Sequence, residues 1–187
     1  MVRKMIILLA VAVTVTGGTA GAAVSPAPQT VSQQDKDFLV QAHQANLAEI
    51  EGGKAAEAKT SDSEGRESAQ TVRDLGERFV ADHTNLDESV RQVADKLGVK
   101  LPDQPTAAQR EQLDKLGALS GADFDKAWLS EELEGHRETL AAIEKEVGSG
   151  SSPEVKKLAT DAKPVVEEHI DLLLHAEETA TPAPSES

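Results

Sequence analysis

The sequence predicts an all-α fold arranged as an antiparallel four-helix bundle. Between residues 32 and 177, apolar side chains recur at intervals of three and four, and no stretch alternates long enough for a strand. Four long periodic segments are separated by polar or glycine-bearing breaks. The breaks are short except between the second and third segments, where a short extra helix is expected, so an up-down-up-down order is favoured.

Capping signals indicate where the helices begin and end. Ser32 stands three residues before Asp35, a spacing that favours the start of the first helix. Thr106 is expected to cap the short helix of the crossing, and Ser152, with a proline next to it, is expected to cap the last long helix. Gly98 is expected to end the second helix.

Two features inside the predicted helices affect their packing. The Gly52-Gly53 pair lowers intrinsic helix stability but allows a neighbouring helix to approach closely. Pro164 lies inside the periodic pattern of the last helix, so a kink is expected there.

Residues 1–23 have the pattern of a secretory signal peptide. Arg3 and Lys4 precede an apolar stretch of about twelve residues, too short to cross a membrane, and small residues follow. Cleavage after Ala22 and cleavage after Ala23 both fit. The protein is therefore expected outside the cytoplasm, in the cell envelope, in the periplasm or in the extracellular space.

The rest of the chain divides into three parts. Residues 24–31 form a proline-bearing spacer, residues 32–177 form the helical domain, and residues 178–187 form an acidic tail expected to be disordered.

Composition excludes several classes of function. The chain has 33 acidic and 19 basic residues, a net charge of −14 and no cysteine. An acidic surface repels nucleic acids and anionic lipids, so neither nucleic-acid binding nor stable membrane insertion after signal cleavage is expected. A protein partner or a cell-envelope component is left unidentified by the sequence.

The one sequence pattern that indicates a possible chemical function involves three histidines. His83, His136 and His169 fall on the inward stripes of three different predicted helices. Counting residues from the turns places His83 and His136 at similar heights and His169 about 6 Å away. The height predicted for Glu49 relative to the histidines depends on whether the first turn centres near Thr60 or a few residues later.

These histidines have two interpretations. They could bind a divalent transition metal such as zinc, iron, copper or nickel, with help from a nearby carboxylate. They could also be core residues whose ring nitrogens find backbone or carboxylate partners. The candidate metal-binding carboxylates are Glu49, Asp82, Glu132 and Glu168.

The sequence does not favour a redox di-iron centre. Ferritin-like di-iron proteins use Glu-x-x-His motifs, whereas Val80, Leu133 and Val166 stand three residues before the three histidines. The other two histidines, His43 and His175, are expected to be partly exposed.

No arrangement for nucleophilic catalysis is evident, since cysteine is absent and no Gly-x-Ser-x-Gly elbow occurs. A hydrolase would need a metal-activated water. The leading interpretation is a non-enzymatic exported protein with a structural, stress-related or interaction role. The alternative is a metal-binding or metal-buffering protein with a histidine-based site inside the bundle.

Several short motifs together resemble one bacterial family. They are Gln34-Asp35 with Phe38-Leu39, Asn46 to Ile50 before Gly53, Asp82-His83-Thr84, Leu101-Pro102, Leu119-Ser120-Gly121 before Phe124-Asp125, His136, and Pro164 before His169. From Ser32 to Ala176 the chain resembles the family named domain of unknown function 4142. That resemblance implies a secreted, ferritin-like helical bundle without an established activity, in which His83, His136 and His169 occupy the family's histidine positions.

Overall fold

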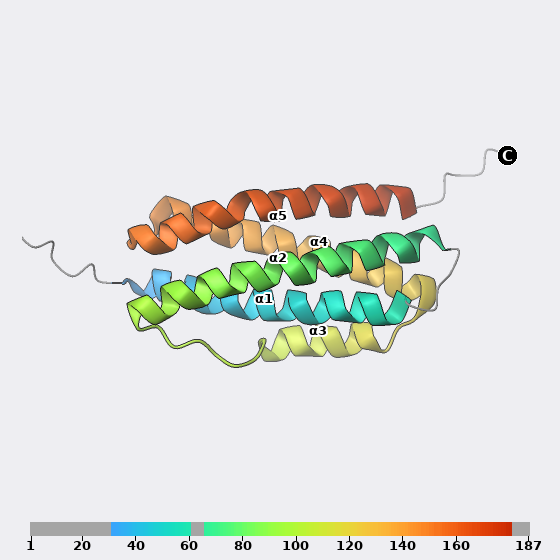
Figure 1. The fold of residues 1–187 in the computed structure, drawn as a ribbon, viewed down its shortest axis with the longest axis horizontal. Helices are drawn as coiled ribbons and strands as arrows, with labels where there is room; N and C mark the ends of the chain where they lie inside the picture. Colours follow the sequence, from blue (N-terminus) through green and yellow to red (C-terminus); the bar gives the residue numbers. More distant parts are fainter. Residues whose placement is uncertain (1–30, 61–65, 181–187) are drawn as a thin grey trace, which may run out of the picture.

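The computed structural model describes residues 31–60 and 66–180, and within these ranges it is all-α, with five helices and no strand (Figure 1). The helices are α1 (Gln33–Thr60), α2 (Glu67–Leu97), α3 (Ala107–Gly117), α4 (Gly121–Ser149) and α5 (Pro153–Ala180). None of the helices in the described ranges is long and apolar enough to span a membrane.

Four long helices lie side by side along the longest axis of the molecule (Figure 1). Helices α1 and α2 run in opposite directions, as do α4 and α5, but α2 and α4 run in the same direction, since Arg66 at the start of α2 pairs with Asp125 at the start of α4 at 2.7 Å. The predicted up-down-up-down order is therefore wrong, because the crossing through α3 carries the chain back to the end at which α2 begins. The short helix α3 lies against α1 and α4, in the crossing between α2 and α4. This is the extra helix that the sequence predicts, so its place in the fold agrees with expectation.

The predicted helix boundaries are confirmed by hydrogen bonds and backbone angles. The backbone N–H of Ser32 donates to the Asp35 carboxylate at 2.7 Å, and that of Asp35 donates to Ser32 Oγ at 3.2 Å. Thr106 forms a full capping box, and Gly98 ends α2 in the left-handed region with φ 68°. The Ser152 hydroxyl accepts from the third residue of α5 at 3.4 Å.

The C-terminal boundary differs from the predicted one. Helix α5 continues through Pro164 and ends at Ala180, three residues inside the segment expected to be disordered. The Thr179 hydroxyl donates to the carbonyl of His175 at 3.1 Å, so the polar side chain is accommodated within the last helical turns. The predicted signal peptide and the remainder of the tail lie outside the described residues.

The glycines of α1 allow it to approach α2 closely, as the sequence predicts. A Cβ atom on Gly53 would stand 2.7 Å from the carbonyl oxygen of Gly76, and one on Gly76 would stand 2.7 Å from the Cβ of Ala56. Both separations are shorter than real carbon contacts, so the two helices can be this close only where side chains are missing.

The buried apolar side chains form two clusters at different levels of the fold. One contains Phe79, Trp128 and Leu173, and the other contains Leu39, Val155 and Val166 among its members. Along α2, α4 and α5, the segment between the two clusters carries a histidine. A polar layer therefore interrupts the core midway along three helices.

We expect Gly76→Ala to lower the free energy of unfolding by about 1–3 kcal/mol, because the added methyl group overpacks the α1–α2 contact. Gly148→Ala in α4 is the matched control, since its Cβ would meet no heavy atom within 4 Å among the described residues. That substitution should be neutral or add up to about 1 kcal/mol through helix propensity. Urea unfolding followed by circular dichroism measures both, and equal effects would contradict the close packing.

Candidate metal centre

The structure brings His83, His136 and His169 together in the polar layer. His83 Nε2 lies 3.3 Å from His136 Nε2, which lies 3.1 Å from His169 Nδ1. All three side chains are buried. One ring nitrogen from each of α2, α4 and α5 thus faces a common point.

Two aromatic side chains, Phe79 and Trp128, lie on one side of this cluster. The Phe79 ring lies one helical turn before His83 and has its centroid 4.4 Å from that of His169 and 4.9 Å from that of His136. Trp128 stacks on Phe79 and donates its indole N–H to a carbonyl of α1 at 3.0 Å. The histidine rings therefore pack on one side against Phe79, which is itself supported by Trp128.

The outward nitrogen of each ring has an oxygen partner. His83 Nδ1 lies 2.9 Å from the amide oxygen of Asn46, and His136 Nδ1 lies 2.8 Å from the carbonyl oxygen of Glu132. His169 Nε2 lies 3.0 Å from the carboxylate of Asp82. A carbonyl oxygen and a carboxylate can only accept, so the ring nitrogens donate.

These partners determine which nitrogens carry lone pairs. A neutral imidazole has one N–H, and in each ring it is directed outward to oxygen. With this tautomer in each ring, the inward nitrogens carry lone pairs, and His136 Nε2 lies 3.3 Å from the inward nitrogen of His83 and 3.1 Å from that of His169. Lone pairs at that separation repel unless a proton or a metal ion lies between them.

Burial favours the neutral form of His83 and of His169. Burial lowers the pKa of His83 to about 4, although the neighbouring Glu49 carboxylate works in the opposite direction. Burial also lowers the pKa of His169, opposed by its hydrogen bond to Asp82. Both rings are therefore available as ligands at neutral pH.

Two buried carboxyl groups lie beside the histidines. Glu49, on α1, has one oxygen 4.0 Å from His83 Nε2 and the other 3.8 Å from His136 Nδ1. Glu132 Oε2 lies 3.9 Å from His136 Nδ1. Gly52 leaves space for Glu132, because a Cβ there would stand 2.7 Å from Glu132 Oε1.

The two carboxyl groups share one negative charge. Burial raises the pKa of Glu132 well above its usual range, and the charge of Glu49 raises it further. Burial also acts to raise the pKa of Glu49. The electrostatic effect of His136 and a hydrogen bond from Glu132 together are larger, so the pKa of Glu49 is lowered. Glu49 is therefore the ionised member of the pair and carries the charge nearest the three nitrogens.

Of the remaining predicted carboxylates, Asp82 belongs to the site and Glu168 does not. Arg78 binds both, at 3.3 Å from Asp82 and 2.9 Å from Glu168. Partial burial works to raise the pKa of Asp82, but the bonds from His169 and Arg78 lower it. The Glu168 side chain is 57% exposed and points away, because it lies one position before His169 on α5.

Sequence reasoning was wrong about His43 and missed the role of Asn46. His43 is buried, with Nδ1 2.6 Å from Asp87 and Nε2 2.8 Å from the carbonyl oxygen of Pro102. Its partners are 44 and 59 residues away, so no local pattern reveals them. His175 is exposed, as expected.

Two of the separations among the three nitrogens are those expected between ligands of one metal ion. Four ligands placed tetrahedrally about 2.0–2.1 Å from a zinc ion stand roughly 3.3 Å apart, compared with 3.3 and 3.1 Å here. Glu49 Oε2 lies 4.0 Å from His83 Nε2, so the carboxylate must move toward the three nitrogens before it can act as a fourth ligand. The outward bonds to oxygen are the contacts that orient metal-bound imidazoles in proteins.

Fold and site together define an all-α protein with a buried three-histidine cluster. The family described as "Domain of unknown function (DUF4142)" matches residues 20–176, and the chain belongs to that family. No curated protein matches the chain. Among solved structures it is similar to a crystal structure of a DUF305 fragment from Deinococcus radiodurans, with a TM-score of 0.66 and 14% identity over 80% of this chain and 98% of that one. At this identity the likeness concerns the fold alone.

In the metal-free protein, we expect acid to destabilise the fold through His83. The unfolded chain protonates this ring near pH 6.5, whereas the folded chain does so at about pH 4. The contribution of His83 is thus complete above pH 6.5 and is lost as pH falls toward 4, by about 3 kcal/mol. Urea unfolding at pH 7 and pH 4.5 measures the loss, and a His83→Gln variant with the same pH dependence would contradict it.

Proposed function

We propose that this protein binds one divalent transition metal ion through His83, His136 and His169. The observation that carries the proposal is the inward convergence of three unprotonated nitrogens, each fixed by an oxygen partner on its other side. A histidine that only packs in the core needs hydrogen-bond partners for its ring nitrogens. The outward contacts already supply one partner for each ring. The converging lone pairs call for a positive ion.

Glu49 is the proposed fourth ligand. Its side chain is 11% exposed, and its Oε2 atom is buried without a hydrogen-bond donor among the described residues. Three neutral imidazoles and one carboxylate suit zinc, copper, nickel or iron. The set favours stable binding or buffering of the metal over redox chemistry at a di-iron centre, since the Glu-x-x-His motifs are missing.

Two broader features belong to the same proposal. The four long helices are interpreted as a ferritin-like bundle, supported by their side-by-side packing and by the long crossing through α3 (Figure 1). The protein is proposed to act outside the cytoplasm, on the evidence of the charged, apolar and small-residue pattern of residues 1–23.

Elemental analysis of untagged protein tests the metal site. After exposure to zinc, copper, nickel and iron in turn, followed by dialysis, at least one metal should remain at about one ion per chain. The His83→Ala/His136→Ala variant should lose it. His175→Ala is the control, because that ring is exposed and should leave metal content unchanged. Protein that retains no metal would instead favour a purely structural or interaction role.

Asp82→Asn should lower zinc affinity by about 10–100-fold, because the carboxylate that orients His169 is removed. Glu168→Gln is a matched control, since it removes the other acidic partner of Arg78 without touching a histidine. Competition with a zinc-binding dye gives both dissociation constants. Equal losses in the two variants would indicate a general charge effect, and the orienting role of Asp82 would be rejected.

A further inference from the structure

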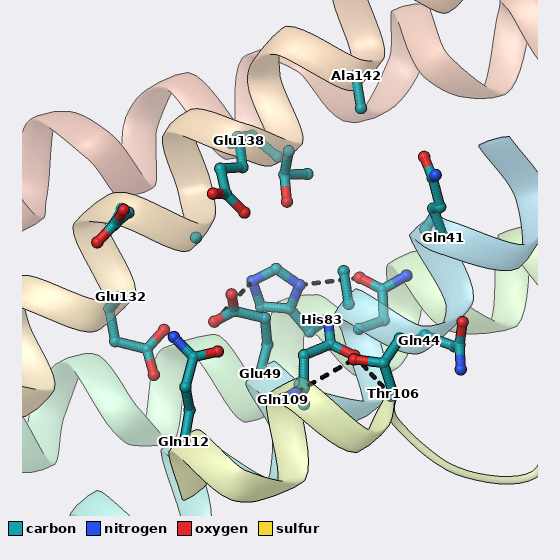
Figure 2. Close-up of a pocket in the computed structure, with 18 of the residues that line it drawn as sticks. Gln41, Gln44, Glu49, His83, Thr106, Gln109, Gln112, Glu132, Glu138 and Ala142 are labelled. Atoms are coloured by element: carbon teal, nitrogen blue, oxygen red, sulfur yellow. Dashed lines mark hydrogen bonds and ion pairs between the residues drawn. The ribbon is translucent and has the colours of Figure 1, made fainter. Parts of the chain in front are cut away.

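A large cavity opens beside the metal centre. Its volume is about 760 Å³, and it is lined by residues of all five helices. Figure 2 shows Glu49, His83 and Glu132 toward one end, with Gln41 and Ala142 toward the other. A cavity of this size is within the range of sites that enclose small organic molecules.

The two ends of the cavity differ in polarity. Away from the histidines it is lined mainly by apolar side chains, among them Phe38, Val90, Ile143, Leu158 and Val166, with Gln41 also on the wall. Along α1, the eleven-residue step from Phe38 to Glu49 corresponds to about 16 Å. The cavity therefore offers an elongated apolar section that ends at a carboxylate.

The charges around the cavity are strongly acidic. Within the described ranges, Lys115 is the one lysine or arginine on its wall, and it pairs with Glu111 at 2.8 Å. The glutamates on the wall are Glu49, Glu111, Glu131, Glu132, Glu134 and Glu138. Such a lining repels anionic ligands and favours cations.

The polar end also has acceptors without donors. The Glu132 side chain is only 8% exposed, yet its Oε2 atom receives no hydrogen bond from the described residues. The Oε2 atom of Glu49 is in the same situation. Buried oxygens of this kind are normally satisfied. Because both atoms are shielded from the cavity, a ligand donor reaches them only after a small movement of the two side chains.

We propose that this cavity binds an organic amine with an extended apolar body. The alkyl or aromatic part lies in the section lined by Phe38, Ile143 and Val166, and the ammonium group donates to the Glu49–Glu132 pair. An ammonium group has three donors and one positive charge, which match the two unpartnered oxygens and the acidic lining of the cavity. This inference shares Glu49 with the proposed metal site, so it concerns the cavity of the metal-free protein.

Calorimetric titration of chelator-treated full-length protein with decylamine, decanol and decanoate tests the proposal. Metal is removed because a bound ion would occupy Glu49. Decylamine should bind saturably at about one per chain and about tenfold or more tighter than decanol. Decanoate should bind weakest. Equal binding of all three, or decylamine binding that does not saturate, would overturn the proposal.

Matched variants locate the ligand. Ala142→Trp should fill the cavity and abolish binding, whereas Ala141→Trp, on the exposed side of the same helix, should not. Glu49→Gln should reduce decylamine affinity to that of decanol, whereas Glu51→Gln, exposed on α1, should leave it unchanged. The glutamine variants keep the side-chain shape, so they decide the question if Ala142→Trp fails to fold. Binding unaffected by Glu49→Gln would refute the ammonium contact.

The amine and metal proposals fail separately. Protein that binds decylamine but retains no zinc would refute the metal function and leave this inference standing. Protein that retains zinc but shows no preference for the amine would refute this inference and leave the metal function standing.

Discussion

The constraint on which the structure depends is the burial of three imidazoles in one layer between two apolar clusters. Each ring has two nitrogens, and a buried ring must satisfy both. In this protein the outward nitrogens reach an amide, a backbone carbonyl and a carboxylate, and the inward ones meet one another. The outward contacts fix the rings, so the electron pairs converge as a consequence of the fold.

Small residues allow the other polar side chains of this layer to reach the histidines. The close approach at Gly53 and Gly76 brings α1 near α2, so that Asn46 and Glu49 reach the histidines of neighbouring helices. Gly52 gives space to a buried glutamate of α4. The low aromatic content, at 2%, is consistent with this packing, because slender helices can lie closer together.

Much of the fold and part of the site can be predicted from the sequence. Periodicity and capping residues reveal the helices, since both are local properties. The inward stripes select the three histidines, but residue counting separates His169 from His136, whereas the structure places their nitrogens 3.1 Å apart. Counting omits helix tilt and side-chain direction, which move ring atoms by several ångströms. Glu168 was a candidate by proximity alone, and one position along a helix turns a side chain away by roughly 100°.

X-ray absorption at the zinc edge of stoichiometrically loaded protein tests the central claim most directly. The structure predicts a first shell of three imidazole nitrogens and one carboxylate oxygen at about 2.0–2.1 Å, with the outer-ring scattering typical of histidine. A shell composed of oxygen alone, without imidazole scattering, would show that the ion binds the acidic surface and that the three histidines serve only to pack the core.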